Sequence, residues 1–238
     1  MKNSANETEK KEIACPIPTS LAGAGTHERV LKLIEKYLPQ SSRVVDLAAG
    51  EGAFSVELKH RGHEVLAVDA SRESWKAPEI DLRVQNLDGE FADKLLNANE
   101  KFDAVIAIEI IEHLENPFNF ARQCAKLLKP NGLLFLSTPN VEAIFSRLIF
   151  LYTGRLNSFT EYETVRPAHI TPIFKWKLDL LLDEAGFEQV WEEFNRQVHV
   201  AGTNLKIRAS SFAARVLNPF LKGAKGDESR IVVACLKR

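Results

Sequence analysis

Residues 44–52 read VVDLAAGEG, and this stretch decides the fold expected for the whole chain. The pattern predicts a short buried strand with an acidic residue, Asp46, at its end, followed by a turn that contains Gly50 and Gly52. Residues 53–58 then predict a helix. Glycine lacks a Cβ and lets the backbone approach a ligand closely, and ligands bind where the strands of an open α/β sheet end. The sequence therefore predicts a ligand site at this turn.

The charges beside the turn favour one kind of ligand. A pyrophosphate prefers uncharged N–H groups and a helix N-terminus, whereas Asp46 and Glu51 place two carboxylates beside the turn. Two carboxylates would repel a diphosphate and attract a ligand that carries positive charge and an amino group. S-adenosylmethionine has both, in its sulfonium and its α-amine, so we expect this cofactor.

Four further apolar runs follow at the spacing of strands in one sheet. Residues 64–69 end in Asp69, and a carboxylate at the tip of the neighbouring strand can accept both hydroxyls of an adenosine ribose. The other three runs cover residues 82–88, 102–109 and 132–139. Near-continuous apolar runs are typical of parallel strands that are buried on both faces. The expected fold is α/β, with a doubly wound, mostly parallel sheet.

Four segments in this order resemble the class I S-adenosylmethionine-dependent methyltransferases: DLAAGEG at 46–52, VLAVDAS at 65–71, FDAVIAIEIIEHLENP at 102–117 and LLKPNGLLFLSTPN at 127–140. The likeness covers residues 43–140 and continues more weakly, through DLLLDEAGF, to about residue 190. The family pattern D-x-G-x-G-x-G has glycine where this chain has Ala48. Alanine costs little there unless the position needs a positive φ. The resemblance implies a Rossmann-like methyltransferase fold with S-adenosylmethionine as its cofactor.

The resemblance also implies which residues bind the cofactor. Asp69 would bind the ribose, Gly50 and Gly52 would bring the backbone against the methionine portion, and Asp46 would orient the ammonium. Asn86 and Leu87 would recognise adenine, with Asp88 as the substitute for Asn86. The full expected set comprises Asp46, Ala48, Gly50, Gly52, Asp69, Asn86, Leu87, Asp88 and Glu109.

Outside this core the chain divides into an arm, two more strands and two insertions. Residues 1–24 are interpreted as a mobile N-terminal arm, and residues 25–238 as a single methyltransferase domain. Helices are expected at 27–38, with Thr26 as the cap, and at 53–61, 91–98, 117–128, 141–152 and 174–185. A sixth strand is expected at 187–194 and a seventh at 231–236, and the family's fold inserts this last strand antiparallel beside the sixth. The segments 141–172 and 195–228 are predicted to be insertions that form a substrate cap above the strand ends.

The sequence Glu109-Ile110-Ile111-Glu112-His113 lies at the expected exit of the fourth strand. Two carboxylates and an imidazole this close could bind a hard divalent cation such as Mg²⁺. The motif is similar to the metal motif of ubiquinone-pathway O-methyltransferases and of small-RNA 2′-O-methyltransferases. The latter have a further histidine downstream, in a position comparable to His169, so the implied site is Glu109, Glu112, His113 and His169. The alternative is a glutamate–histidine pair without metal, as in many relatives.

His113 and His169 are also the candidates for the general base. A hydroxyl must lose its proton as it attacks a methyl group, and an imidazole has a suitable pKa to accept it. The alternative is that each is a hydrogen-bonded structural histidine. The remaining histidines, His27, His60, His63 and His199, have no such context and are expected at the surface.

Composition narrows the function further. The formal net charge of −1 provides no broad basic field for nucleic acid, so no nucleic-acid partner is expected. The isolated cysteines are typical of reduced thiols in a cytoplasmic protein, and residues 1–12 are too polar for a signal peptide. The most apolar stretch, 143–152, is too short to span a bilayer, although peripheral membrane contact stays open. A monomer or a homodimer is expected.

The expected activity is methyl transfer, by O-methylation, from S-adenosylmethionine to a small-molecule, lipid-linked or saccharide acceptor. The chain resembles both ubiquinone-pathway-type and polysaccharide-type O-methyltransferases, and fold analogy does not settle the acceptor. One alternative is an NAD(P)-dependent oxidoreductase, although Ser55 stands where the third glycine of its fingerprint would be. Another is a non-catalytic, cofactor-binding partner subunit.

Overall fold

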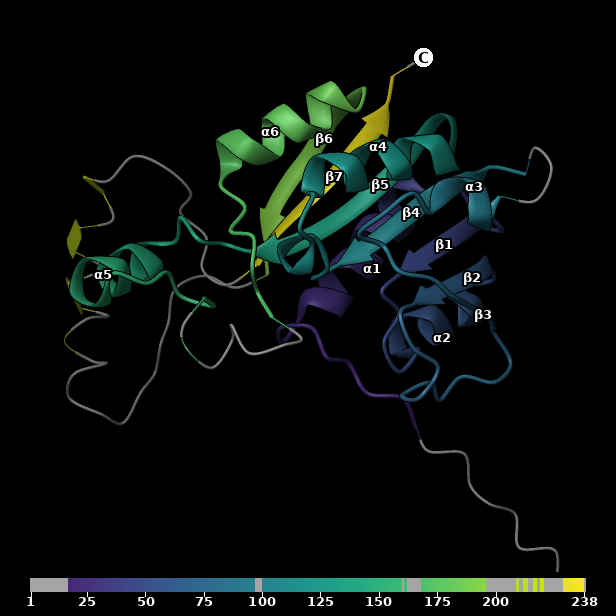
Figure 1. Ribbon diagram of the computed structural model, residues 1–238, viewed down its shortest axis with the longest axis horizontal. Coiled ribbons are helices and arrows are strands. Elements are labelled where there is room, and N and C mark those ends of the chain that lie inside the picture. The colour runs from purple at the N-terminus through teal and green to yellow at the C-terminus, as the bar shows by residue number, and fades with distance from the viewer. Residues whose placement is uncertain are drawn as a thin grey trace, which may run out of the picture.

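The computed structural model describes residues 17–96, 100–159, 161, 168–195, 209, 212–213, 216–217, 219–220 and 229–237. These residues form one seven-stranded sheet in the order β3-β2-β1-β4-β5-β7-β6 (Figure 1). The strands are β1 Arg43–Leu47, β2 Glu64–Asp69, β3 Asp81–Val84, β4 Phe102–Ile108, β5 Leu128–Pro139, β6 Phe187–Phe194 and β7 Ser229–Leu236.

Strand direction follows the expected pattern. β1 pairs in parallel with β2 and β4, β2 with β3, and β4 with β5. β7 lies between β5 and β6 and runs antiparallel to both. The predicted doubly wound, mostly parallel sheet with an antiparallel last strand is therefore confirmed. The apolar runs form strands because most positions of β1, β4 and β5 are buried in the middle of the sheet, where apolar side chains are favoured.

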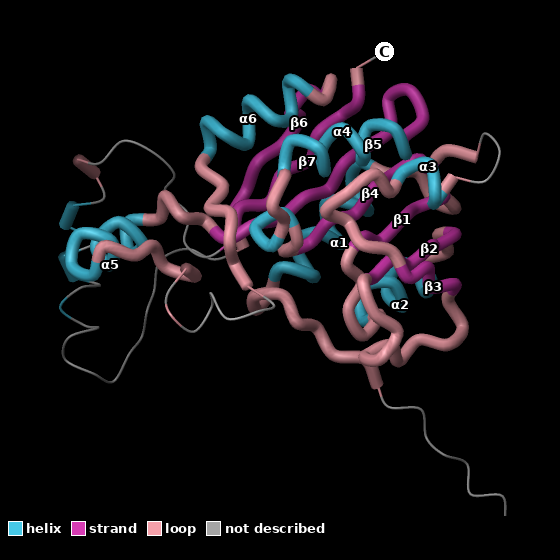
Figure 2. The backbone as a smooth tube through the Cα atoms, viewed as in Figure 1, coloured by secondary structure: helices cyan, strands magenta, loops and turns pink. Residues whose placement is uncertain are grey.

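Helices cover both faces of the sheet, as Figure 2 shows. One apolar cluster packs α3, α4 and α6 against the sheet, and a second packs α1 and α2 against its other face. The helices are α1 Thr26–Tyr37, α2 Ala53–His60, α3 Ala92–Leu95, η1 Ile111–His113, α4 Pro117–Leu127, α5 Ile144–Thr153 and α6 Lys175–Glu184.

Three local expectations were wrong. The third strand ends at Val84, because the Asn86 side chain accepts the Asp88 N–H at 2.9 Å and closes a turn there. The fifth strand begins earlier than expected, at Leu128. Thr26 does not cap α1, since the cap position is Gly25, with a φ of 81°, and no side chain caps the helix. Thr26 is instead buried, where its Oγ1 accepts a hydrogen bond from Asn195 at 2.9 Å.

The two predicted cap insertions leave the sheet at neighbouring points. The first carries α5, which stands beyond the end where β5 finishes (Figure 1). Most of the second, 196–228, lies outside the described residues. Their roots share a buried arginine: the Arg230 guanidinium lies 2.9 Å from Glu142 Oε2 and 2.8 Å from Glu192 Oε1. Arg230 is only 1% exposed, so this cluster fixes where both insertions begin.

Candidate functional site

A cavity of about 640 Å³ opens at the carboxyl ends of β1, β2 and β4. Its size suits a small-molecule ligand. The N-terminal segment before α1, the turn after β1 and residues 168–169 complete its walls. Seven residues expected to bind cofactor, catalyse or hold metal line it: Asp46, Ala48, Gly50, Asp69, Glu109, His113 and His169. The site therefore lies where an open α/β sheet normally binds its ligand.

The turn after β1 is held tightly against β2. The Gly50 N–H donates to Asp69 Oδ2 at 2.8 Å, and the Ala49 N–H donates to the Val68 carbonyl at 3.0 Å. Ala48 has a φ of 62°, Gly50 a φ of 58° and Gly52 a φ of 95°, so this turn has a positive φ at three residues. Ala48 therefore occupies a position that glycine would adopt with less strain.

Gly52 permits a close approach behind the turn. Its φ is 95°, and a Cβ built there would lie 2.8 Å from the Ala77 Cβ and 2.9 Å from Trp75 Cζ3. The Trp75 ring thus packs directly against the turn. Glycine is needed here for both the backbone angle and the missing Cβ.

Asp46 is a buried carboxyl group at the base of the cavity. It is 2% exposed, and its Oδ2 accepts a hydrogen bond from Ser55 Oγ at 2.6 Å. Burial raises the pKa of Asp46 to about 7, and the nearby Asp69 adds to this, while the Ser55 hydrogen bond opposes it. Because desolvation penalises the charged form, a cationic ligand group beside Asp46 would be favoured.

Glu51 does not act as the uncompensated charge that the sequence suggested. Its Oε1 lies 2.6 Å from Lys76 Nζ, and its Oε2 accepts the Thr19 N–H and the Thr19 hydroxyl, each at 2.7 Å. These contacts, led by Lys76, lower the pKa of Glu51 to about 2. The charge argument against a diphosphate therefore loses Glu51 and rests on the other carboxyl groups that line the cavity, Asp46, Asp69 and Glu109.

The residues expected to recognise adenine lie outside the cavity lining. Asn86 is exposed and Leu87 is buried. Asp88 Oδ1 accepts the Glu115 N–H at 2.7 Å, which ties the end of β3 to the loop after η1. None of these three residues lines the described cavity.

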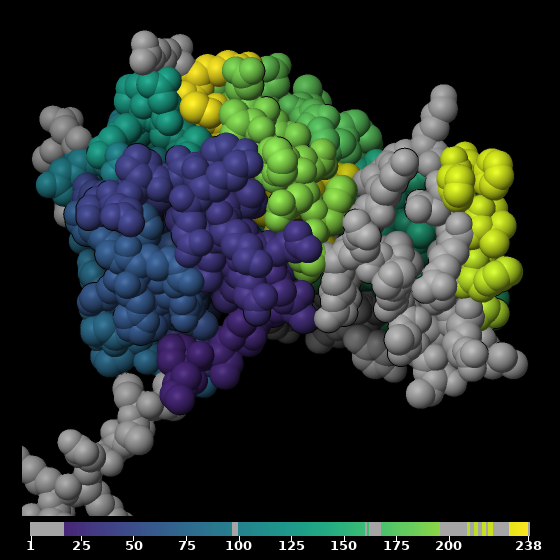
Figure 3. Space-filling view, turned by 180° about the vertical axis from the view of Figure 1, so that it is seen from behind, coloured from purple at the N-terminus to yellow at the C-terminus, as the bar shows by residue number. Residues whose placement is uncertain are grey.

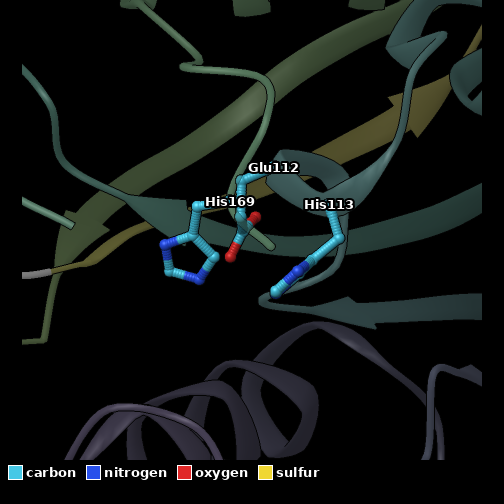
Figure 4. A group of neighbouring side chains, drawn as sticks. All are labelled: Glu112, His113 and His169. Carbon is cyan, nitrogen blue, oxygen red and sulfur yellow. The ribbon is translucent and has the colours of Figure 1, made fainter. Parts of the chain in front are cut away.

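His113 and His169 meet at the cavity although 55 residues separate them (Figure 4). Their ring centroids are 4.6 Å apart. The backbone carbonyl of Glu112 holds the segment that follows His169 beside η1, because it accepts the N–H groups of Ile170 and Thr171 at 2.9 Å each. Glu112 lies between the two imidazole rings in Figure 4.

Each imidazole has one nitrogen paired with a backbone carbonyl. His113 Nδ1 lies 3.0 Å from the Ala168 oxygen, and His169 Nδ1 lies 2.6 Å from the Ser158 oxygen. A carbonyl can only accept, so Nδ1 carries the hydrogen and the neutral ring presents Nε2 as its acceptor. Burial, together with His169, lowers the pKa of His113, so this ring is neutral at pH 7.

Glu112 is fully buried beside the histidines. Its Oε2 accepts a hydrogen bond from Thr138 Oγ1 at 3.0 Å, while its Oε1 is buried without a hydrogen-bond partner. Burial and the nearby Glu109 raise the pKa of Glu112 well above its usual range. Ligand atoms of Glu112, His113 and His169 all lie within 4.8 Å of one another. Glu109, the fourth expected ligand, is outside this group and accepts a hydrogen bond from Ser137 Oγ at 2.8 Å.

Two histidines expected at the surface are not fully exposed: His27 is half-buried and His63 is buried. His27 lines the cavity, its ring lies 4.9 Å from that of Phe54, and burial lowers its pKa to about 4. His63 is 9% exposed. The sequence reasoning also missed Thr19 and Leu21, which line the cavity from the segment before α1. No motif marks these residues, since contacts between distant parts of the chain place them there.

A family model described as a methyltransferase domain matches residues 23–193. The ubiquinone biosynthesis O-methyltransferase of Xanthomonas axonopodis pv. citri is 36% identical over 111 residues, which make up 43% of this chain and 45% of that protein. The match therefore spans less than half the length of that curated relative.

Solved structures share the architecture across most of the chain. An S-adenosylmethionine-dependent methyltransferase from Archaeoglobus fulgidus has 21% identity and a TM-score of 0.59, with 89% of this chain and 95% of that chain covered. The Burkholderia thailandensis 1,6-didemethyltoxoflavin-N1-methyltransferase, solved with S-adenosylhomocysteine, has 13% identity and a TM-score of 0.57, with 89% and 78% covered. At these identities the likeness establishes the fold alone. None of the helices among the described residues is long and apolar enough to cross a bilayer.

Proposed function

This chain belongs to the methyltransferase-domain family, the class I S-adenosylmethionine-dependent methyltransferases, and from this premise we propose that it methylates an acceptor hydroxyl. One observation carries the proposal: the turn after β1 and the pair His113 and His169 line the same cavity. A donor site and a candidate base thus share one space. Alignment of the reacting groups is the main contribution that such a site makes to the rate.

The residues of the turn fit the cofactor. Asp69 accepts the Gly50 N–H through Oδ2 and the Ser71 N–H through Oδ1, and these bonds orient the carboxylate so that its remaining lone pairs can accept ribose hydroxyls. Asp46 presents a buried carboxyl group that would ionise beside the ammonium of the methionine portion. S-adenosylmethionine, when bound, supplies a methyl group activated by the sulfonium.

The histidine pair supports a base for the acceptor. With Nδ1 paired to the Ala168 carbonyl, the Nε2 of His113 is the nitrogen that can accept the proton of a hydroxyl. His169 presents Nε2 in the same way, through its Nδ1 contact with the Ser158 carbonyl. We assign the first role to His113, because burial keeps its ring neutral and able to accept a proton.

The same side chains offer a second way to activate the hydroxyl, through a divalent cation. Glu112, His113 and His169 each offer one ligand atom within 4.8 Å of the others, which makes a mixed oxygen and nitrogen donor set, and Glu112 Oε1 has no hydrogen-bond partner. Imidazole ligands suit Zn²⁺ or Fe²⁺ better than Mg²⁺, which prefers oxygen. A bound cation would polarise the acceptor hydroxyl and lower its pKa. An Nε2 atom that holds a cation cannot also accept a proton. Turnover measured after a chelator has removed any cation therefore distinguishes the histidine-base mechanism from the cation mechanism.

The insertions and the relatives support the proposed acceptor class. Three residues at the end of α5, Phe150, Leu151 and Tyr152, are 49%, 80% and 90% exposed. This apolar surface beyond the strand ends supports an acceptor hydroxyl on an apolar scaffold, such as a phenol or a lipid-linked sugar. The ubiquinone biosynthesis O-methyltransferases are relatives with an oxygen acceptor by name. A nicotinamide oxidoreductase gains no support from the family match.

The test is methyl transfer from radiolabelled S-adenosylmethionine to a panel of catechols, quinols, sugars and amines, with and without EDTA. We expect product with a hydroxyl acceptor, and loss of turnover in His113→Ala with cofactor affinity retained. His60→Ala is the matched control, since His60 is exposed on α2. Cofactor binding without turnover on any acceptor would favour a non-catalytic partner subunit, and no cofactor binding would refute the proposal.

A further inference from the structure

The segment just before α1 forms part of the cavity wall. Thr19, Leu21, Ala22 and Gly23 all line the cavity, although they precede every motif of the methyltransferase core. Figure 3 shows this darkest purple segment lying on the body of the molecule beside the blue region that contains α2.

Glu51 holds the segment in place. Its Oε2 accepts both the backbone N–H and the hydroxyl of Thr19, each at 2.7 Å. Its Oε1 pairs with Lys76 Nζ at 2.6 Å, and its carbonyl accepts the Lys76 N–H at 3.0 Å. One side chain of the turn after β1 thus joins the N-terminal segment to the loop that carries Trp75. Hydrogen bonds to an ionised group are stronger than neutral ones.

Leu21 is the apolar residue of this wall. Its Cδ1 lies 3.4 Å from the position that a Cβ on Gly50 would occupy, so the side chain reaches the glycine turn. It is nevertheless 77% exposed. When a ligand covers an exposed leucine in a cavity wall, the burial of its apolar surface stabilises the complex.

We propose that segment 17–23 is an additional wall of the cofactor site, fastened by Glu51, and that Thr19 and Leu21 slow the departure of the bound nucleoside. The proposal rests on S-adenosylmethionine as the cofactor and extends the proposed function to residues outside the family's motifs. Leu21 would cover the ligand beside Gly50, and Thr19 would keep Leu21 in position through Glu51.

The test uses the full chain and S-adenosylhomocysteine, with the dissociation constant measured by calorimetry and the dissociation rate by stopped flow. Leu21→Ala should raise the dissociation rate about tenfold, since the lost carbons would no longer be buried against the ligand. Thr19→Val should raise it about three- to tenfold through loss of the hydroxyl bond, and Thr19→Ser should restore it. Ile17→Ala is the matched control, because Ile17 is 84% exposed and does not line the cavity.

Hydrogen exchange gives a second readout, because the Thr19 N–H is bonded to Glu51. A peptide covering residues 17–24 should exchange more slowly when S-adenosylhomocysteine is bound. Wild-type binding with unchanged rates in Leu21→Ala and Thr19→Val, and no added protection of this peptide, would overturn the inference alone. A wild-type chain that fails to bind S-adenosylhomocysteine would instead count against the proposed function.

Discussion

Replacement of Asp46 by asparagine should make the free energy of unfolding less dependent on pH. The folded-state pKa of Asp46 is about 7, whereas the unfolded value is close to 3.8. The neutral form is therefore favoured in the folded protein, and this group lowers stability as the pH rises from 3.8 to 7. At one pKa unit per about 1.4 kcal/mol, the cost is about 2 kcal/mol at pH 5 and about 4 kcal/mol above pH 7.

The asparagine variant carries its own burial cost, but that cost does not depend on pH. The difference in the free energy of unfolding, variant minus wild type, should therefore grow by about 2–3 kcal/mol between pH 5 and pH 8. Urea titrations followed by tryptophan fluorescence would measure it. Asp81→Asn serves as the control, since that side chain is 65% exposed. Ser55→Ala should move the wild-type inflection to higher pH, because the Ser55 hydrogen bond holds the pKa of Asp46 down. A difference that stays constant across this range would refute the reasoning.

Ala48→Gly should stabilise the chain by about 0.5–1 kcal/mol, because release from the left-handed φ of 62° outweighs the added entropy of unfolding; a lower urea midpoint would contradict this. Gly52→Ala should destabilise it by about 2–4 kcal/mol, since its Cβ would lie 2.8 Å from that of Ala77, and an unchanged melting temperature would count against the clash. Asp69→Ala should weaken S-adenosylhomocysteine binding by about 10- to 100-fold in calorimetry, and unchanged affinity would remove Asp69 from the site. Arg230→Met should destabilise the fold by about 3 kcal/mol, because Glu142 and Glu192 would lose their shared cation; urea denaturation should show that stability recovers when both glutamates are also replaced by glutamine.

Buried parallel strands were predictable because their environment admits few residue types. β4 lies between β1 and β5 with every residue from Ala104 to Ile108 buried, and its apolar run reads directly as a strand. The end of β3 was harder to place, because a side-chain turn between Asn86 and Asp88 stops the strand before the expected residue. A local polar contact thus overrode an extended pattern.

The site also combines features that the sequence predicts with features that it does not. The residues of the turn after β1 follow one another in the chain, so their shared position was readable from the motif. The pairing of Glu51 with Lys76 and Thr19 depends on segments that meet only in the folded chain. His27 was expected at the surface because the residues next to it in the sequence do not indicate a contact with Phe54. The centroids of the two rings lie 4.9 Å apart. Long-range contacts of this kind leave no periodicity in the sequence.

The shared arginine at the roots of the two insertions has a consequence for recombination between relatives. A chimera that replaces only residues 141–172 would lose Glu142 and leave Arg230 with Glu192 alone. A chimera that replaces only the later insertion with its flanks would lose Glu192 or Arg230, so either exchange would break part of this buried charge cluster. Exchange of both insertions together, with their three anchoring residues, keeps the charges matched. Under the proposed function, a change of acceptor preference is therefore expected to need exchange of both insertions together.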